Sequence, residues 1–333
     1  MKSFFKLVLA NLTAIFIVFA GFFAFFLAFV ILGSLAETSD VKSDSVLTLD
    51  LKTKIIDSPS EDQEDFFSIN KEEKAVLLYD VLQAISKAKT DDNIKGISIE
   101  SDQINAGITQ LDDIRNALID FKKSGKFVYA YGNSVSQGAY YLGSVADKYY
   151  LNPAGGIELK GLSAEVTFFK SFAEKYGIGI QVIRHGKFKA AVEPFLKDEI
   201  SPENKEQLST LLNDIWDNTS SKIANSRKIS ESEFKTITDS LYGYLPNLSL
   251  QYKLADQLIQ KSEYDKLIKK KLNIDSDKKI NKISFAKYSE SVNSESGKNK
   301  IAILYASGAI NNGKGYDAIY SENFVKEIKK LQK

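Results

Sequence analysis

The sequence contains no cysteine, and it has one histidine (His185), one tryptophan and one methionine among 333 residues. The absence of cysteine excludes thiol nucleophiles, disulfide bonds and thiolate-ligated metals. A single histidine is too few for a zinc site of the H-E-x-x-H kind, so we expect no metal and no cofactor. If the chain is a hydrolase, lysine, aspartate or glutamate should carry the proton transfer in place of His185.

An excess of charge of one sign is also absent. The chain has 44 Lys plus Arg against 43 Asp plus Glu, a formal net charge of +1. No global positive field attracts a polyanion, so we expect no nucleic-acid partner. The remaining composition, 44% apolar and 26% charged, is that of a folded chain with enough length for one large domain or two modest ones.

One long hydrophobic run is present, from Leu7 to Ala36, and it contains no charged residue. At about 1.5 Å per residue, such a helix exceeds the roughly 20 residues that cross a bilayer. Lysines precede the run and carboxylates follow it, so the N-terminus should remain cytoplasmic and the body should be exported. We therefore predict a transmembrane anchor over 1–36. A cleaved signal peptide is the alternative, although its apolar region is usually only about 7–15 residues long.

Strand and helix signals alternate after the anchor. Alternation at period two predicts a strand, and apolar residues spaced three or four apart predict an amphipathic helix. These patterns predict strands over 46–51, 94–99 and 127–131 and helices over 72–88 and 110–123. Strand, helix, strand in this order implies parallel pairing through crossover helices, and hence an α/β fold. Further along, Ser201-Pro202 is a strong start signal for a long helix over 204–223.

The composition changes towards Lys, Ser, Asn and Asp over 263–300, which we interpret as a linker. Beyond it, 301–305 predicts a strand and 324–331 an amphipathic helix, echoing the opening of the first unit. So short a stretch cannot bury its own apolar faces. We therefore interpret 301–333 as the start of an incomplete second repeat, and the chain end as a truncation.

Two stretches between 133 and 199 are candidates for chemistry. At Ser136-Gln137-Gly138, small residues between a strand and a helical run suit a tight turn whose N–H groups point outward, as in an oxyanion pocket. Glycine at such a turn is more often a packing requirement. Lys189 lies between Phe188 and Ala190, an apolar setting that would favour the neutral amine over the ammonium ion. Most lysines are solvated surface groups, so the residues alone leave both interpretations open.

Three pieces of sequence resemble the signal peptide peptidase A (protease IV) family, in its long form with two repeats of a ClpP/crotonase-like fold. They are Ser136-Gln137-Gly138-x-Tyr140-Tyr141, Gly186-x-x-Lys189-x-Ala191-Val192-Glu193-Pro194-Phe195 and Ser201-Pro202. The likeness also covers the anchor, the linker and the start of the second repeat. It implies that 45–262 form a first ClpP/crotonase-like peptidase repeat, a parallel-sheet α/β domain that follows an N-terminal transmembrane helix.

The resemblance also implies roles for particular residues. It makes Lys189 the general base, and it places the nucleophilic serine in the second repeat, beyond residue 333. Matching Tyr140-Tyr141 to the family's aromatic pair puts Gln137 where a nucleophile would stand, so we reject Ser136 as the nucleophile. His185 matches no required position and is expected to be only a neighbour of the lysine loop.

The implied protein is a membrane-anchored serine endopeptidase of the Ser/Lys-dyad type that degrades signal peptides left in the bacterial inner membrane after export. It would cross the membrane once, with a cytoplasmic N-terminus and an extracytoplasmic catalytic domain. Its partners would be peptide substrates, the bilayer and further copies of itself in a homo-oligomer. This chain holds the lysine half only, so it should be inactive by itself.

Two alternatives compete with this function. The first is a catalytically inactive, membrane-anchored scaffold that binds peptides or a protein, which the missing nucleophile favours. The second is an acyl-CoA hydratase or isomerase of the crotonase fold. It is disfavoured because such enzymes generally lack an export anchor, and because the turn region has no paired acidic residues.

Overall fold

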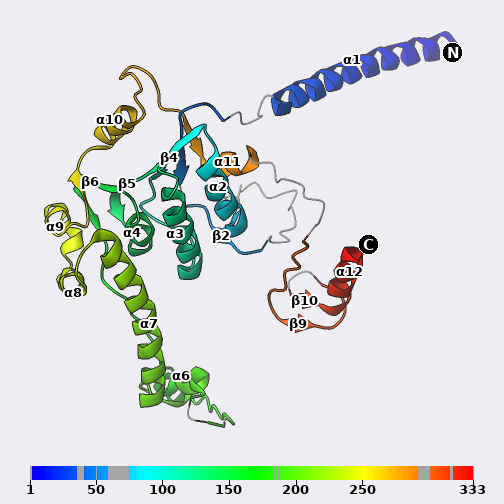
Figure 1. The fold of residues 1–333 in the computed structure, drawn as a ribbon. Coiled ribbons are helices and arrows are strands. Elements are labelled where there is room, and N and C mark those ends of the chain that lie inside the picture. The colour runs from blue at the N-terminus through cyan, green and yellow to red at the C-terminus, as the bar shows by residue number, and fades with distance from the viewer. Residues whose placement is uncertain are drawn as a thin grey trace.

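The computed structural model describes residues 2–35, 41–49, 51–58, 75–183, 185–186, 188–291, 301–315 and 318–332. Its first element is the single long helix α1 (Lys2–Leu35), which Figure 1 shows projecting from the body. Within α1, the stretch Leu9–Phe26 has a mean hydropathy of 2.2, and none of it is buried against the rest of the chain. The expected apolar helix is therefore present, with a length and composition that would allow it to cross a bilayer.

The body is built on a six-stranded, entirely parallel sheet with strand order β7-β6-β5-β4-β1-β8. The strands are β1 (Ser45–Leu49), β4 (Ile94–Ile99), β5 (Phe127–Val135), β6 (Lys148–Ile157), β7 (Gln257–Leu258) and β8 (Lys282–Ser284). The two-residue strands β2 (Ile55–Ile56) and β3 (Val76–Leu77) form a separate parallel pair. The predicted parallel α/β fold is confirmed.

Helices cover both faces of this sheet, as a parallel sheet requires. The larger core lies under α2 (Leu78–Thr90), α3 (Ile108–Lys122), α4 (Gln137–Gly143) and α11 (Phe285–Ser291). The opposite face carries a smaller, aromatic-rich core under α10 (Lys261–Lys271). Neighbouring residues on one strand point to opposite faces of the sheet: Val46 packs in the smaller core and Leu47 in the larger.

Gly125 follows α3 with a φ of +81°, a backbone conformation that favours glycine.

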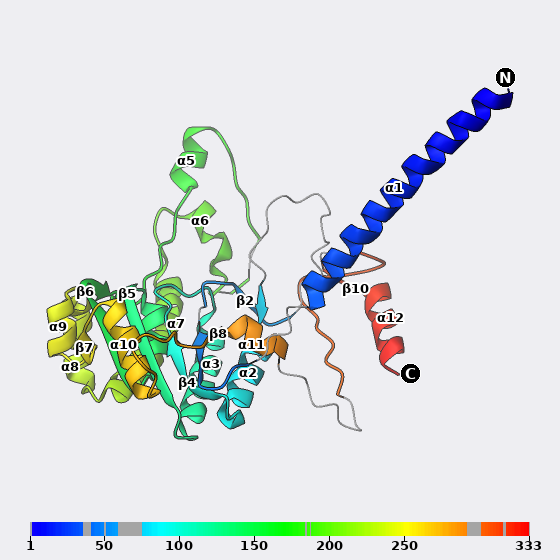
Figure 2. The same cartoon turned by 90° about the horizontal axis from the view of Figure 1, so that it is seen from above.

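Between β6 and the long helix α7 (Pro202–Arg227), the chain leaves the sheet and forms an excursion over residues 159–200, called the arm below. The arm carries α5 (Lys170–Lys175), the turn η1 (Ala190–Val192) and α6 (Glu193–Leu196). Figure 1 shows α7 running from the sheet to the distant end that bears α6, and Figure 2 shows α5 and α6 projecting beyond the sheet. The predicted long helix is confirmed, and the Ser201 hydroxyl caps it by accepting the Asn204 N–H at 3.2 Å. Two short helices, α8 (Glu231–Asp239) and α9 (Pro246–Gln251), lead back to β7.

The prediction of a linker over 263–300 is wrong for residues 263–291. Strand β8 pairs with β1 at the edge of the sheet, and the Val46 N–H donates to the Asn281 carbonyl at 2.8 Å. Helix α10 buries Tyr264 and Ile268, and α11 buries Phe285 and Tyr288. Only about one residue in three or four of these helices faces the core, so the polar composition concealed them. Residues 292–300 lie outside the described part of the chain.

Residues 301–332 differ from expectation at their start. The strand predicted over 301–305 is absent, and those residues have no strand to pair with among the described ones. The segment instead forms the two-residue strands β9 (Ile310–Asn311) and β10 (Ile319–Tyr320), followed by α12 (Ser321–Leu331). The predicted amphipathic helix is therefore present as α12, but none of its residues is buried. Of the other predicted helices, the one over 72–88 begins at Leu78 in α2, and 72–74 lie outside the described residues.

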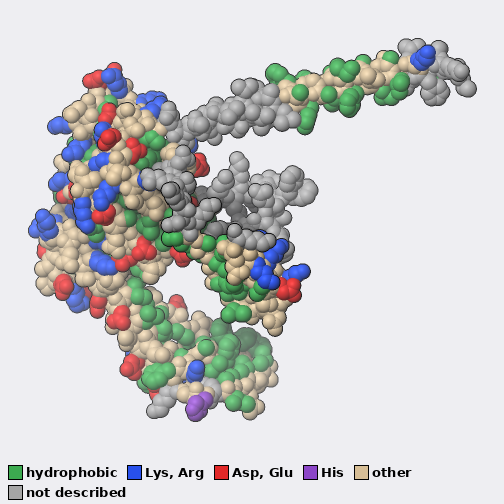
Figure 3. Space-filling view, turned by 45° about the vertical axis from the view of Figure 1, so that its right-hand side comes forward, with side chains coloured by type: hydrophobic (Ala, Val, Ile, Leu, Met, Phe, Trp, Pro, Cys, Tyr) green, Lys and Arg blue, Asp and Glu red, His purple; other side chains and the backbone are tan. Residues whose placement is uncertain are grey.

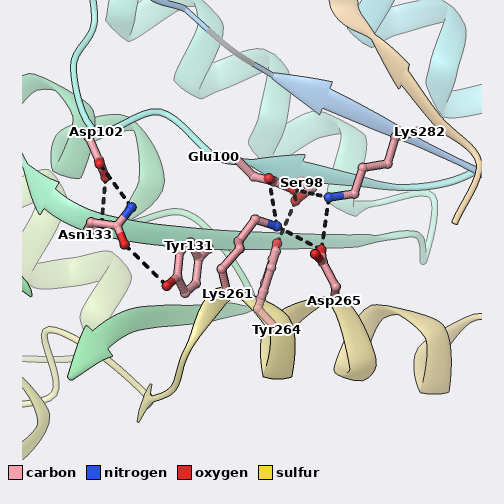
Figure 4. Close-up of polar contacts among 9 residues, drawn as sticks. All are labelled: Ser98, Glu100, Asp102, Tyr131, Asn133, Lys261, Tyr264, Asp265 and Lys282. Carbon is pink, nitrogen blue, oxygen red and sulfur yellow. Dashed lines mark hydrogen bonds and ion pairs between the residues drawn. The ribbon is translucent and has the colours of Figure 1, made fainter. Parts of the chain in front are cut away.

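An ion network fastens α10 and β8 to the end of β4 (Figure 4). Lys261 contacts Glu100 at 2.9 Å and Asp265 at 2.8 Å, and Lys282 contacts the same carboxylates at 2.9 and 3.0 Å. Burial alone would raise the pKa of Glu100, but hydrogen bonds from Lys282 and Lys261 outweigh it and hold the pKa below its ordinary value. Burial would likewise raise the pKa of Asp265, but hydrogen bonds from Lys261 and Lys282 outweigh it, so this pKa is also lowered.

We predict that this network makes stability depend on pH. Because the folded-state pKa values of Glu100 and Asp265 are lowered, the stabilisation is fully present above the unfolded values of about 4 and is lost as pH falls through the folded ones. Glu100→Gln should lower the free energy of unfolding by about 2 kcal/mol at pH 7 and by less at pH 3. Urea unfolding of the detergent-solubilised chain at both pH values measures this. The exposed Glu206→Gln serves as control, and an equal loss at both pH values would contradict the prediction.

Candidate active site

The turn that the sequence singled out lies between β5 and α4. Ser136 is the N-cap of α4, and its Oγ accepts the Ala139 N–H at 3.3 Å. The Ser136 N–H donates to the Asp102 carbonyl at 2.8 Å. The hydroxyl of Ser136 therefore serves as a helix cap, a structural role that fits its rejection as a nucleophile.

The side chain of Gln137 ties this turn to the first residues of the arm. Its Oε1 accepts the N–H groups of Lys160 and Gly161, each at 3.1 Å, and its Nε2 donates to the Gly161 carbonyl at 3.1 Å. Gly161 has a φ of +83°, so the backbone at this point takes a conformation that disfavours other residues. Gln137 thus pairs with two backbone N–H donors and one backbone carbonyl where the arm begins.

We predict that loss of this amide loosens the base of the arm. Gln137→Ala removes three hydrogen bonds, each with a net contribution of about 1 kcal/mol. Amide hydrogen exchange at Lys160 and Gly161 should accelerate by about tenfold or more, while amides of β4 keep their protection. Mass-spectrometric exchange on the intact chain measures both. Unchanged protection at 160–161 would show that other contacts hold the segment.

The aromatic pair that follows is fully buried and anchors α4 on both sides. The Tyr140 hydroxyl donates to the Leu254 carbonyl at 2.7 Å, and the Tyr141 hydroxyl donates to Asp112 Oδ1 at 2.6 Å. Burial raises the pKa of both phenols, so both remain neutral hydrogen-bond donors at physiological pH. Asp112 also accepts from Lys222 Nζ at 2.6 Å, which extends the connection to α7.

Arg115 of α3 is a structural residue that the sequence reasoning missed. Its side chain is buried, and its guanidinium stands 4.7 Å from the centre of the Tyr141 ring. It donates to four acceptors on α7 and on α4 and its C-cap: the Tyr141 carbonyl, Ser144 Oγ at 2.8 Å, the Lys222 carbonyl at 2.7 Å and Ser226 Oγ at 2.6 Å. A signal existed, because Arg115 is four residues after Leu111 and three before Leu118, on the apolar stripe of its helix.

Lys189 lies at the other end of α7, directly before the η1 turn, and its side chain is exposed. It lines a cavity of about 690 Å³ whose other lining residues are mostly apolar: Val182, Ile183, His185, Phe188, Ala190, Ala191 and Val192. The structure therefore brings Lys189 and His185 together at one cavity, with Gln137 at the opposite end of the arm. The apolar surroundings expected for Lys189 are present, but its side chain is exposed in this chain.

Contacts between α5 and the segment around α6 hold the end of the arm together, and its surface exposes apolar side chains. The Phe169 N–H donates to the Pro194 carbonyl at 2.6 Å, and the rings of Phe169 and Phe195 stack with centroids 5.9 Å apart. Ser171 bonds Asp198 through its N–H and its hydroxyl. Several large apolar side chains are nevertheless exposed, with Ile183 at 97%; Figure 3 shows such side chains gathered over the lower part of the molecule. Exposed apolar patches of this kind mark sites of peptide or protein contact.

No cation site is evident in the described ranges: they contain no group of three or more His, Asp or Glu side chains placed to hold a metal ion.

Comparison with known proteins gives consistent matches. Residues 120–275 match the family described as Peptidase family S49. The chain is 30% identical over 293 residues to Protease 4 of Salmonella typhi, covering 83% of this chain and 47% of that protein. It is 30% identical over 315 residues to Protease 4 of Haemophilus influenzae (89% and 51%), and 28% identical over 306 residues to the chloroplastic serine protease SPPA of Arabidopsis thaliana (88% and 43%). The chain spans about half the length of these curated relatives.

Proposed function

Since this chain belongs to the signal peptide peptidase A family, peptidase family S49, we propose that it supplies the general-base half of a membrane-anchored serine endopeptidase. The observation that carries the proposal is the position of Lys189. Lys189 lines a mostly apolar cavity of about 690 Å³, directly before the η1 turn and near the start of the long helix α7. Such a cavity can hold an apolar peptide segment next to a base.

The proposed reaction is acyl transfer through a Ser/Lys dyad. The neutral amine of Lys189 takes the proton of a serine hydroxyl as the serine oxygen attacks the scissile carbonyl. Backbone N–H groups stabilise the oxyanion, and Lys189 returns the proton to the leaving amine. Lys189 needs to be neutral for the first step, and covering its apolar cavity with substrate or protein would exclude water and favour that form.

We place the serine outside this chain, in a second repeat that begins at residue 301. Two observations support this placement. The curated relatives are about twice as long as this chain, and 301–332 open with short strands and a helix whose residues are all unburied. On this proposal the chain alone is inactive, and activity requires the second repeat to close over the Lys189 cavity.

The proposed substrates are signal peptides left in the bacterial inner membrane after export. The apolar cavity and the exposed apolar side chains of the arm suit an extended, hydrophobic peptide. Helix α1 would keep the enzyme in the same membrane, crossing it once with the lysine-flanked N-terminus in the cytoplasm and the body outside. The exposed apolar surface of the arm also fits a homo-oligomer, in which copies cover one another.

The experiment that tests this proposal measures hydrolysis of an apolar peptide by the gene product that carries both repeats, in detergent. Turnover that depends on the amine of Lys189 supports the protease. The second candidate is a catalytically inactive anchored scaffold, which the exposure of Lys189 in this chain favours. Binding of the same peptide without any turnover would support the scaffold and contradict the protease.

A further inference from the structure

The residue four positions after Lys189 is a buried carboxylate. Glu193 is the first residue of α6, and only 1% of it is exposed, whereas Lys189 and Phe195 on either side are exposed. A carboxylate this deeply buried needs hydrogen-bond or charged partners to offset its lost hydration. The partners therefore indicate what the residue is for.

The start of α7 supplies hydrogen bonds to both oxygens of this carboxylate. The Ser201 hydroxyl donates to Glu193 Oε1 at 2.5 Å, the Ser201 N–H reaches Oε2 at 3.4 Å, and the Asn204 side-chain amide donates to Oε2 at 3.3 Å. Ser201 has two roles at once, because the same hydroxyl oxygen accepts the Asn204 N–H as the helix cap. Lys197 Nζ adds an ion pair at 3.9 Å.

These contacts keep the carboxylate charged. The hydrogen bond from the Ser201 hydroxyl holds the pKa of Glu193 below its ordinary range, against the opposing effect of burial. A negative charge is also favourable at the N-terminus of a helix. The link between α6 and α7 is therefore a charge-assisted one that persists at neutral pH.

The link connects Lys189 and the η1 turn that follows it (189–192, called the Lys189 turn below) to the body of the protein through α7. At its C-terminal end this helix buries Ile223 and Ala224 in the core and is held by Arg115. At its N-terminal end it holds Glu193 through Ser201 and Asn204. The position of the η1 turn relative to the sheet is thus set by contacts at both ends of α7.

We propose that Glu193 is a positioning residue that fixes the Lys189 turn on the start of α7 and so aims the amine into its cavity. This inference rests on the proposed function, because Lys189 is the base of that reaction. Glu193 itself contacts α7 and has no part in the proton transfer.

The first test needs no turnover. In Glu193→Ala, amide hydrogen exchange over 188–192 should accelerate by about tenfold or more, with Glu193→Gln intermediate. Ser201→Ala should accelerate it as well. The exposed Glu199→Gln, the same change in the same stretch, should not. If β4 amides also lose protection in Glu193→Ala, the whole fold is destabilised in that variant. The exchange rates of Glu193→Gln, which conserves the side-chain volume, then decide whether the segment 188–192 is loosened locally. Unchanged protection over 188–192 in both Glu193 variants would overturn the proposal.

The second test uses the gene product with both repeats. Glu193→Gln should lower kcat for an apolar peptide by about tenfold with KM within about twofold of wild type, because the base is misplaced while the cavity remains. Glu193→Asp, which keeps the charge, should recover part of the loss. A loss that appears only in KM would overturn the positioning role. Full turnover in Lys189→Ala would instead defeat the proposed function, and the exchange measurement would still decide whether Glu193 holds the turn.

Discussion

In a gene product that carries the proposed second repeat, Lys189→Ala is expected to lower kcat for hydrolysis of an apolar peptide by about a thousandfold or more. A positioned general base contributes about 10²–10⁴-fold and acts as a unit with its nucleophile. The fold should be unaffected, because the Lys189 side chain is exposed. Steady-state hydrolysis in detergent gives the rate, and the urea midpoint of the same samples shows that the variant is folded.

Two matched variants sharpen this expectation. Lys189→Arg keeps a positive charge but replaces the amine with a guanidinium that does not lose its proton in proteins, so it should be as inactive as the alanine variant. Lys175→Ala, at an exposed lysine elsewhere on the arm, should retain full activity. Activity in Lys189→Arg would mean that Lys189 contributes only charge, and activity in both Lys189 variants would remove it from the mechanism.

Arg115→Ala is expected to cause the largest loss of stability, about 3–5 kcal/mol in the free energy of unfolding. The guanidinium donates to two backbone carbonyls and two hydroxyls on α7 and on α4 and its C-cap, and its removal leaves these acceptors facing a cavity. Arg115→Lys should recover little, because one ammonium cannot reach all four acceptors in the planar geometry that they fit.

Equilibrium unfolding in urea measures this loss, with Lys123→Ala as control. Lys123 is the C-cap residue of the same helix, and its side chain is 70% exposed, so its removal should change stability by no more than about 0.5 kcal/mol. A loss below about 1 kcal/mol in Arg115→Ala would show that water or neighbouring side chains replace the guanidinium. It would also weaken the argument that contacts at both ends of α7 position the Lys189 turn.

Periodicity and capping predicted the elements that depend on local sequence. The predicted strand over 94–99 coincides with β4, and Ser201-Pro202 marked the start of α7 correctly. In these places the local pattern and the tertiary packing favour the same structure. Parallel pairing followed from the order of the elements alone.

The elements that were missed depend on distant partners. Strand β8 is three residues long and is stabilised by β1, more than 200 residues earlier in the sequence. Helices α10 and α11 are polar except for the few residues that they bury, such as Tyr264 and Phe285. Composition averaged over such a stretch resembles that of a linker, because a single apolar stripe contributes little to the mean.

The residues of the candidate site also differ in whether the local sequence reveals them. Lys189 and the turn at Gln137 were found from short motifs. Glu193 stands in the same motif as Lys189 but was given no role, and Arg115 was not identified at all. Both residues are buried charges whose partners lie on other elements, and a sequence does not show which acceptors or donors will surround them. A charged residue on an apolar helical stripe, as at Arg115, is the only warning that the pattern gives.

The length of α7 fixes how far, and in which direction, the Lys189 turn lies from the sheet. A helix turns by about 100° and rises by about 1.5 Å with each residue. One residue added to the exposed half of α7 would therefore rotate the Lys189 turn by about 100° around the helix axis. Three or four added residues would roughly restore the original direction of the turn. The number of residues in α7 between Ser201 and the Arg115 contact at Ser226 therefore has to stay constant, whereas exposed side chains along this stretch can be replaced.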